Sequence, residues 1–250
     1  MAIQLKSTRE IAIMRRAGRI VAITLLELQD KLRPGLSTAD LDQIAEKTVT
    51  ALGATPVFKG YLGYPASICA SVNDEVVHGI PNPERVLYEG DIVSLDFGAL
   101  YQDYVGDAAI TVGVGSISPA AQKLLDVTRA ALGAGISQAR AGNHLSDVSH
   151  AIQAYADQFG LGVVRQYVGH GVGHTMHEAP QVPNFGPPHQ GPVLQAGMTF
   201  AIEPMLNAGT EETMVRPDQW TVVTKDGGLS AHFEHTIAVT TDAPEILTLP

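Results

Sequence analysis

The chain has 250 residues, 45% of them hydrophobic, a formal charge of −10 and a single cysteine, Cys69. Composition and length indicate one globular domain spanning residues 1–250, and the acidic charge argues against specific nucleic-acid binding. A single cysteine excludes an internal disulfide, and the sequence shows neither a secretory signal nor an apolar run of membrane-spanning length, so we expect a cytoplasmic protein without a membrane partner.

The first half is predicted to contain two helices followed by strands. Residues 7–32 carry apolar side chains at helical spacing, with Ser7 and Glu10 as a capping-box pair. A second capped helix is predicted for residues 37–52. Strand-like runs follow at residues 67–72, 91–100 and 106–114.

The same order begins again in the second half, with predicted helices at residues 119–140 and 146–159. An offset of 107 residues superposes Gly35 on Gly142 and Asp96 on Glu203. The last strands match at a larger offset, which leaves an expected inserted loop between residues 204 and 234. We interpret the pattern as an internal duplication with halves at about 7–115 and 116–242.

Helices that precede directly connected strands predict an α+β fold with a largely antiparallel sheet. Equivalent strands of the two halves should meet at the centre of the molecule. A site at that position would take its ligands from both halves.

Four acidic residues interrupt apolar strands at repeat-equivalent positions: Asp96, Asp107, Glu203 and Glu234. Each one alone is compatible with an exposed position on an amphipathic strand. Buried carboxylates need cations, however, and no lysine or arginine accompanies these strands. The set therefore predicts divalent metal ions, and four carboxylates with one imidazole are enough ligands for two of them.

The stretch "GHGVGHTMHEAP" at residues 169–180 holds three histidines. Their spacing suits a helix, but Gly171 and Gly173 would each cost a helix about 1 kcal/mol. In an extended segment, alternation would put His170 and His174 on one face and His177 on the other. The residues alone leave open which of the three binds metal.

Five motifs together resemble type I methionine aminopeptidases: "LDF" at 95–97, "GDAA" at 106–109, "GHGVGHTMHE" at 169–178, "AIEPM" at 201–205 and "EHT" at 234–236. The resemblance covers nearly the whole chain and implies the pita-bread fold, whose pseudo-twofold agrees with the duplication. It also implies removal of the initiator methionine from nascent polypeptides with a small second residue.

The same resemblance implies roles for individual residues. Asp107 and Glu234 would bridge two metal ions, Asp96 would chelate one, and His170 with Glu203 would complete the other. Glu203 would also shuttle a proton for the attack of water on the scissile carbonyl.

Two further histidines are implied to face the substrate: His177, which would hydrogen-bond its carbonyl, and His78, which would contact the peptide near the scissile bond. His174 stands where relatives often carry arginine and is given no catalytic role. The pocket for the methionine side chain would be lined by Phe58, Tyr61, Tyr64, Cys69, Met176 and Trp220. Met176 and Gly98 depart from common family forms.

Two competing interpretations share this fold: an X-Pro aminopeptidase or prolidase-like peptidase, and a binding protein that has lost catalysis. The first usually has a large preceding domain, for which the sequence before residue 8 has no room, and the second should lack ligands that are all present. A type II enzyme would need a long insertion between His177 and Glu203. We expect the minimal bacterial form, a monomer with cobalt, manganese, iron or zinc, that contacts the ribosome at most transiently.

Overall fold

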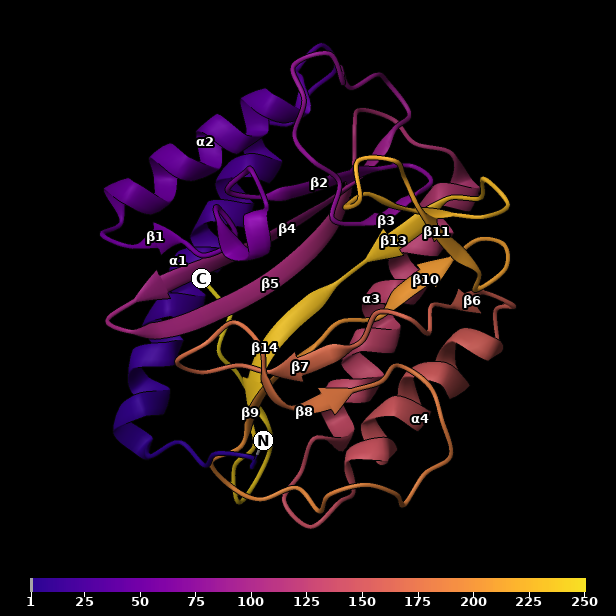
Figure 1. Ribbon diagram of the computed structural model, residues 1–250. Coiled ribbons are helices and arrows are strands. Elements are labelled where there is room, and N and C mark those ends of the chain that lie inside the picture. The colour runs from indigo at the N-terminus through magenta and orange to yellow at the C-terminus, as the bar shows by residue number, and fades with distance from the viewer. Residues whose placement is uncertain (1) are drawn as a thin grey trace.

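The computed structural model describes residues 2–250, with helices and strands arranged as in Figure 1. The helices are α1 (Thr8–Lys31), α2 (Thr38–Ala51), the 3₁₀ turn η1 (Tyr61–Gly63), α3 (Pro119–Gln138) and α4 (Leu145–Asp157). The strands are β1 (Thr55–Pro56), β2 (Cys69–Val72), β3 (Glu75–Val77), β4 (Ile92–Tyr101), β5 (Tyr104–Gly113), β6 (Gly162–Val163), β7 (Gly169–Gly171), β8 (Glu178–Val182), β9 (Thr199–Ile202), β10 (Met205–Asn207), β11 (Thr213–Val215), β12 (Val222–Thr224), β13 (Ser230–His232), β14 (Glu234–Ala238) and β15 (Glu245–Ile246).

The helices begin where side chains satisfy their first backbone N–H groups. Ser7 and Glu10 form the predicted capping box of α1, and Ser37 with Asp40 does the same for α2. Helix α4 begins one residue earlier than predicted, because the carboxylate of Asp147 accepts a hydrogen bond from the backbone N–H of His144 at 2.8 Å.

One sheet of nine strands organises the molecule, in the order β1-β4-β5-β14-β9-β7-β8, with β15 paired to β14 and β2 paired to β4. Its strand pairs are antiparallel, as predicted. The longest pair is the β4–β5 hairpin, whose strands have ten residues each. Strands β5 and β14 lie side by side at the centre of the sheet (Figure 1) and join the first half to the second.

Contacts recur in the two halves at the offset seen in the sequence. Isolated bridges join Ser37 to Val86 and His144 to Val193. The backbone N–H of Gly35 donates to Leu87 at 2.8 Å, and that of Gly142 donates to Leu194 at 2.9 Å. These repeated contacts support the duplication that we propose within one domain.

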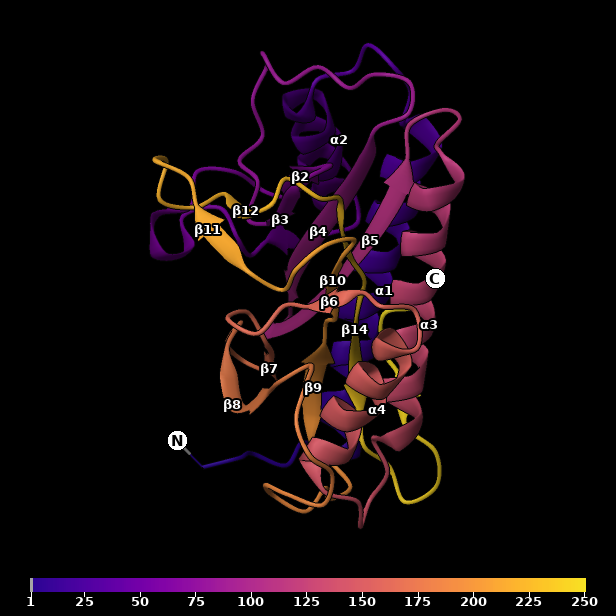
Figure 2. The same cartoon turned by 90° about the vertical axis from the view of Figure 1, so that its right-hand side faces the viewer.

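The long helices cover one face of the main sheet, and the segment around β11–β12 lies on the other side (Figure 2). Between sheet and helices lie two apolar clusters, one beneath α1 and α2 and one beneath α3 and α4. Phe97 and Phe200 are fully buried there. The segment between residues 204 and 234 is not simply the expected loop, since it forms strands β10 to β13, of which β12 pairs with β3. Within residues 2–250, no helix combines the length and the apolar character needed to cross a membrane.

Helix α1 approaches β5 closely because both elements have glycine at the contact. A Cβ atom on Gly106 would lie 2.6 Å from the backbone nitrogen of Gly18. Gly106→Ala should therefore lower the free energy of unfolding by about 1–3 kcal/mol, measured by urea denaturation of metal-free protein. Gly133→Ala in α3 is the matched control: no atom lies within 4 Å of its Cβ position, so it should stabilise by about 0.5–1 kcal/mol. A Gly106→Ala protein as stable as the parent would contradict this account of the packing.

Candidate metal centre and active site

The register of the central strands brings three carboxylates to one face of the sheet. Asp96 on β4 and Glu234 on β14 both stand opposite Ala109 of β5, one on each side. Asp107 precedes Ala109 by two residues and therefore shares its face, because side chains alternate along a strand. Glu203 follows directly after β9, the next strand beyond β14.

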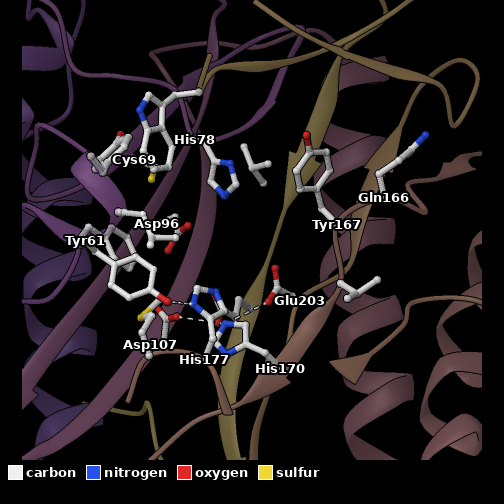
Figure 3. Close-up of a pocket in the computed structure, with 18 residues that line it drawn as sticks. Tyr61, Cys69, His78, Asp96, Asp107, Gln166, Tyr167, His170, His177 and Glu203 are labelled. Atoms are coloured by element: carbon white, nitrogen blue, oxygen red, sulfur yellow. Dashed lines mark hydrogen bonds and ion pairs between the residues drawn. The ribbon is translucent and has the colours of Figure 1, made fainter. Parts of the chain in front are cut away.

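His170 on β7 points toward the carboxylates (Figure 3). Its Nε2 atom lies 3.7 Å from Asp107 Oδ2 and 3.5 Å from Glu203 Oε1. Its Nδ1 atom lies 3.1 Å from the carbonyl oxygen of Gly171. Because a carbonyl only accepts, the Nδ1 atom of the neutral ring carries the proton and Nε2 keeps a lone pair that can bind a metal.

The donor set fits a divalent metal ion. Asp107, His170 and Glu234 each place one ligand atom within 4.8 Å of the others. Three buried oxygens, Asp96 Oδ1, Asp107 Oδ1 and Glu234 Oε1, have no hydrogen-bond partner. Among residues 2–250, no lysine or arginine forms an ion pair with any of the four carboxylates. Uncompensated buried carboxylates of this kind require a cation or a proton.

Burial controls the protonation of the whole site. It raises the pKa of Asp96 to about 7. Burial, reinforced by repulsion among the carboxylates, raises the pKa values of Asp107, Glu203 and Glu234 well above the ordinary range. The same desolvation lowers the pKa values of the imidazoles, to about 4 for His170 and His78 and to about 3 for His232. These three rings are therefore neutral near pH 7.

A cavity of about 300 Å³ is lined by every residue that we predicted from the sequence to belong to the site. Five lining residues were missed, and they are Leu62, Val77, Gln166, Tyr167 and Val168. Gln166, Tyr167 and Val168 directly precede the strand of His170, so closeness to that motif was the available signal. Tyr167 packs edge-on against His78 with ring centroids 5.6 Å apart.

The histidines of the 169–180 stretch separate into two environments. His177 lies beside His170, with ring centroids 4.2 Å apart, and its Nδ1 atom is 2.8 Å from the hydroxyl of Tyr61. His174 packs instead against Tyr104, with ring centroids 4.1 Å apart and the ring planes tilted by 36°. The alternation considered for an extended segment is therefore wrong, because β7 ends at Gly171 and the chain bends before β8.

The apolar part of the cavity lies next to the carboxylates. Phe58, Tyr64, Cys69 and Met176 are all buried, and Trp220 packs edge-on against Tyr64 at 5.0 Å. Burial also raises the pKa of the Cys69 thiol, so this cysteine is no nucleophile at neutral pH.

The glycine at position 98 is explained by this packing. A Cβ atom there would lie 2.4 Å from Val57 Cγ1 and 2.9 Å from Phe58 Cε1. Gly98 therefore lets the pocket segment approach strand β4 without a side chain between them.

Comparison with known proteins gives the family. The sequence profile of Metallopeptidase family M24 matches residues 12–241. The chain belongs to this family. It is 53% identical to a methionine aminopeptidase of Clostridium acetobutylicum over 245 residues, which cover 98% of each chain. The structure of the chain is similar to that of a Thermotoga maritima methionine aminopeptidase, with a TM-score of 0.98, 46% sequence identity and full coverage of both chains.

A more distant structure, the prolidase from Pyrococcus furiosus, has a TM-score of 0.79 at 21% identity, over 98% of this chain and 65% of that one. At this identity the likeness concerns the fold alone. The resemblance to type I methionine aminopeptidases, the α+β pita-bread fold and the metallo-aminopeptidase class predicted from the sequence are thus confirmed.

The raised carboxyl pKa values make the stability of the metal-free protein depend on pH. A carboxyl whose pKa is higher in the folded state stabilises the fold below its unfolded pKa, near 4, and this contribution is lost as pH rises through the folded value. With Asp96 at about 7, the melting temperature of the chelator-treated protein should fall between pH 5 and pH 8. Added Mn(II) should remove most of this fall.

Scanning calorimetry across that pH range measures the effect. Asp96→Asn cannot ionise at this position, so its metal-free melting temperature should vary less with pH. A metal-free melting temperature that stayed constant or rose between pH 5 and pH 8 would contradict the raised carboxyl pKa values.

Proposed function

We propose that the chain removes the N-terminal methionine of nascent polypeptides whose second residue is small, with two divalent metal ions bound at the carboxylate cluster. The observation that carries this proposal is a set of four carboxylates without basic partners, two of them buried (Asp107 and Glu234) and two half-buried (Asp96 and Glu203), that faces a neutral imidazole with a free Nε2 atom. The membership in family M24 and the similarity to methionine aminopeptidases support the reaction class.

The metal ligands we propose are Asp96, Asp107, His170, Glu203 and Glu234. Asp107 and Glu234 lie on the paired central strands β5 and β14 and would bridge the two ions. Asp96 would chelate one ion, and His170 with Glu203 would complete the other. Oxygen-rich sites with one imidazole accept manganese, iron, cobalt or zinc. When bound, such ions polarise the scissile carbonyl and supply hydroxide near neutral pH.

Three side chains of the site would act on the substrate and its protons. Glu203 would accept a proton from the attacking water and return it to the leaving amine. The Tyr61 hydroxyl can donate to Nδ1 of His177, which leaves the proton of that ring on Nε2. His177 would then donate this N–H to the carbonyl oxygen as negative charge develops there.

His78 would contact the peptide near the scissile bond. It directly follows β3 and has a backbone φ of 60°, a conformation that is uncommon for a non-glycine residue. Its ring packs between Tyr167 and Trp220, with centroids 5.6 and 6.2 Å away. These neighbours hold the imidazole over the cavity.

The apolar cavity would hold the methionine side chain. A flexible thioether makes favourable contacts with aromatic rings and apolar walls. Phe58, Tyr61, Tyr64, Cys69, Met176 and Trp220 provide such a surface directly beside the metal ligands.

The nascent polypeptide N-terminus would be the partner, met in the cytoplasm where chains are synthesised and through no more than transient contact with the ribosome. All residues of the proposed site come from one chain. We propose that the protein acts as a monomer.

Metal removal tests the proposed centre. Chelation should abolish hydrolysis of a Met-Ala-Ser peptide, and Mn(II), Fe(II) or Co(II) should restore it. Asp107→Asn should be nearly inactive, because a bridging ligand serves both ions, while its metal-free form should be at least as stable since one source of repulsion is gone. Full turnover by protein that elemental analysis shows to be metal-free would refute the proposal.

His177→Ala tests the proposed hydrogen bond to the carbonyl. Its kcat should fall by about 10²–10³-fold, the usual loss for one donor to a developing oxyanion, with metal content near the parent value. His174→Ala is the matched control from the same loop, and its kcat should stay within about threefold. If His177→Ala lost one metal equivalent, His177 would have to be reassigned as a ligand.

A panel of Met-X-Ser peptides tests the substrate class. Alanine at X should give a much higher kcat/KM than lysine, because little room is left for a long side chain beside two metal ions. Norleucine in place of methionine should be accepted less well, by an amount within the roughly 1–3 kcal/mol of one methylene group. Equal rates for alanine and lysine, or faster cleavage of an Ala-Pro-Ala peptide, would favour the X-Pro peptidase instead.

A further inference from the structure

His232 is a buried histidine next to the metal centre that neither the motifs nor the proposed reaction uses. It ends β13, its side chain is 2% exposed, and neither ring nitrogen has a hydrogen-bond partner. Burying a polar group without a partner costs free energy. A buried imidazole without partners therefore suggests a role that offsets this cost.

A carboxylate close to this ring belongs to a proposed metal ligand. His232 Nε2 lies 3.9 Å from Glu203 Oε2, whereas Oε1 of the same carboxylate faces His170 at 3.5 Å. The two oxygens of Glu203 are thus directed at two different imidazoles.

The two imidazoles have different hydrogen-bonding capacities. His170 holds its proton on Nδ1 against the carbonyl of Gly171, so its Nε2 atom has none to donate to Glu203. His232 has no partner at Nδ1 and is free to carry its proton on Nε2. No side chain of residues 2–250 forms a hydrogen bond to the Glu203 carboxylate, and the Nε2 atom of His232 is 3.9 Å from it.

The backbone around His232 holds the ring in place from two sides. The backbone N–H of His232 donates to the Thr111 hydroxyl on β5 at 2.8 Å. The same hydroxyl lies 2.8 Å from the backbone carbonyl oxygen of His232. On the other side, β13 pairs with β10, with His232 opposite Met205. Met205 is two residues beyond Glu203, so the same short strands position both partners.

We propose that His232 is a positioning residue: its Nε2–H would donate to Oε2 of Glu203 when that carboxylate binds metal, and would thereby keep Oε1 on the side of His170. The inference rests on the proposed metal site. Outer partners of this kind fix the orientation of a ligating carboxylate, and their loss typically weakens metal binding or activity by 10–100-fold.

Two substitutions separate donation from packing. His232→Leu removes the donor and leaves an apolar group of similar size, whereas His232→Gln retains an N–H donor. Calorimetric titration of the metal-free proteins with Mn(II) should give a Kd raised about 10–100-fold for His232→Leu and within about threefold for His232→Gln. At saturating Mn(II), His232→Leu should show a lowered kcat with little change in KM.

His235→Leu is the matched control. His235 is a half-buried histidine whose Nδ1 atom contacts the Thr248 hydroxyl at 2.8 Å instead of the metal centre. This variant should melt at a lower temperature and bind Mn(II) within about threefold of the parent protein.

Three results would overturn the inference: parental Mn(II) affinity and kcat for His232→Leu, an equal loss for His232→Gln, or an equal loss for His235→Leu. A parent protein that bound no Mn(II) would instead overturn the metal site and the inference together. The titration of the parent therefore distinguishes the two failures.

Discussion

A cluster of four buried or half-buried carboxylates without basic partners is the constraint on which the rest of the structure depends. Asp96, Asp107 and Glu234 share one face of adjacent strands, and Glu203 joins them from the next strand. Desolvation raises the pKa values of all four groups, and repulsion among the carboxylates adds to this effect for Asp107, Glu203 and Glu234. The fold tolerates the close approach of these groups because the carboxyls can bind protons, which neutralise them, or divalent metal ions, which balance their negative charge.

Neighbouring backbone and hydroxyl groups determine which ring nitrogen of each histidine around the cluster carries the proton, and so whether that histidine can bind metal or donate a hydrogen bond. The carbonyl of Gly171 holds a proton on Nδ1 of His170 and so leaves a metal-binding lone pair on Nε2. The hydroxyl of Tyr61 can do the opposite for His177, leaving an N–H directed at substrate. His232, held by Thr111, can offer an N–H to the far side of Glu203. The chemistry of each ring is thus decided by its neighbour.

Much of this organisation can be read from the sequence, because it depends on local and periodic signals. Ser7 and Ser37 mark helix starts, and the acidic residues stand out within apolar strands. Other features depend on tertiary contacts that no short pattern encodes. The direction of the His174 side chain depends on where β7 ends. The strands between residues 204 and 234 need β3 and β6 as pairing partners. A role for His232 can be inferred only from its position beside Glu203.

Proton release on metal binding tests the central claim most directly. Metal-free protein should be titrated with Mn(II) at pH 7 in buffers of different ionisation enthalpy, so that the heats report the protons displaced. Because burial holds protons on the carboxyl cluster, the account predicts release of more than one proton per protein at saturation. Saturable Mn(II) binding with the same heat in every buffer would show that the carboxylates are already ionised in the metal-free state, and would contradict the account.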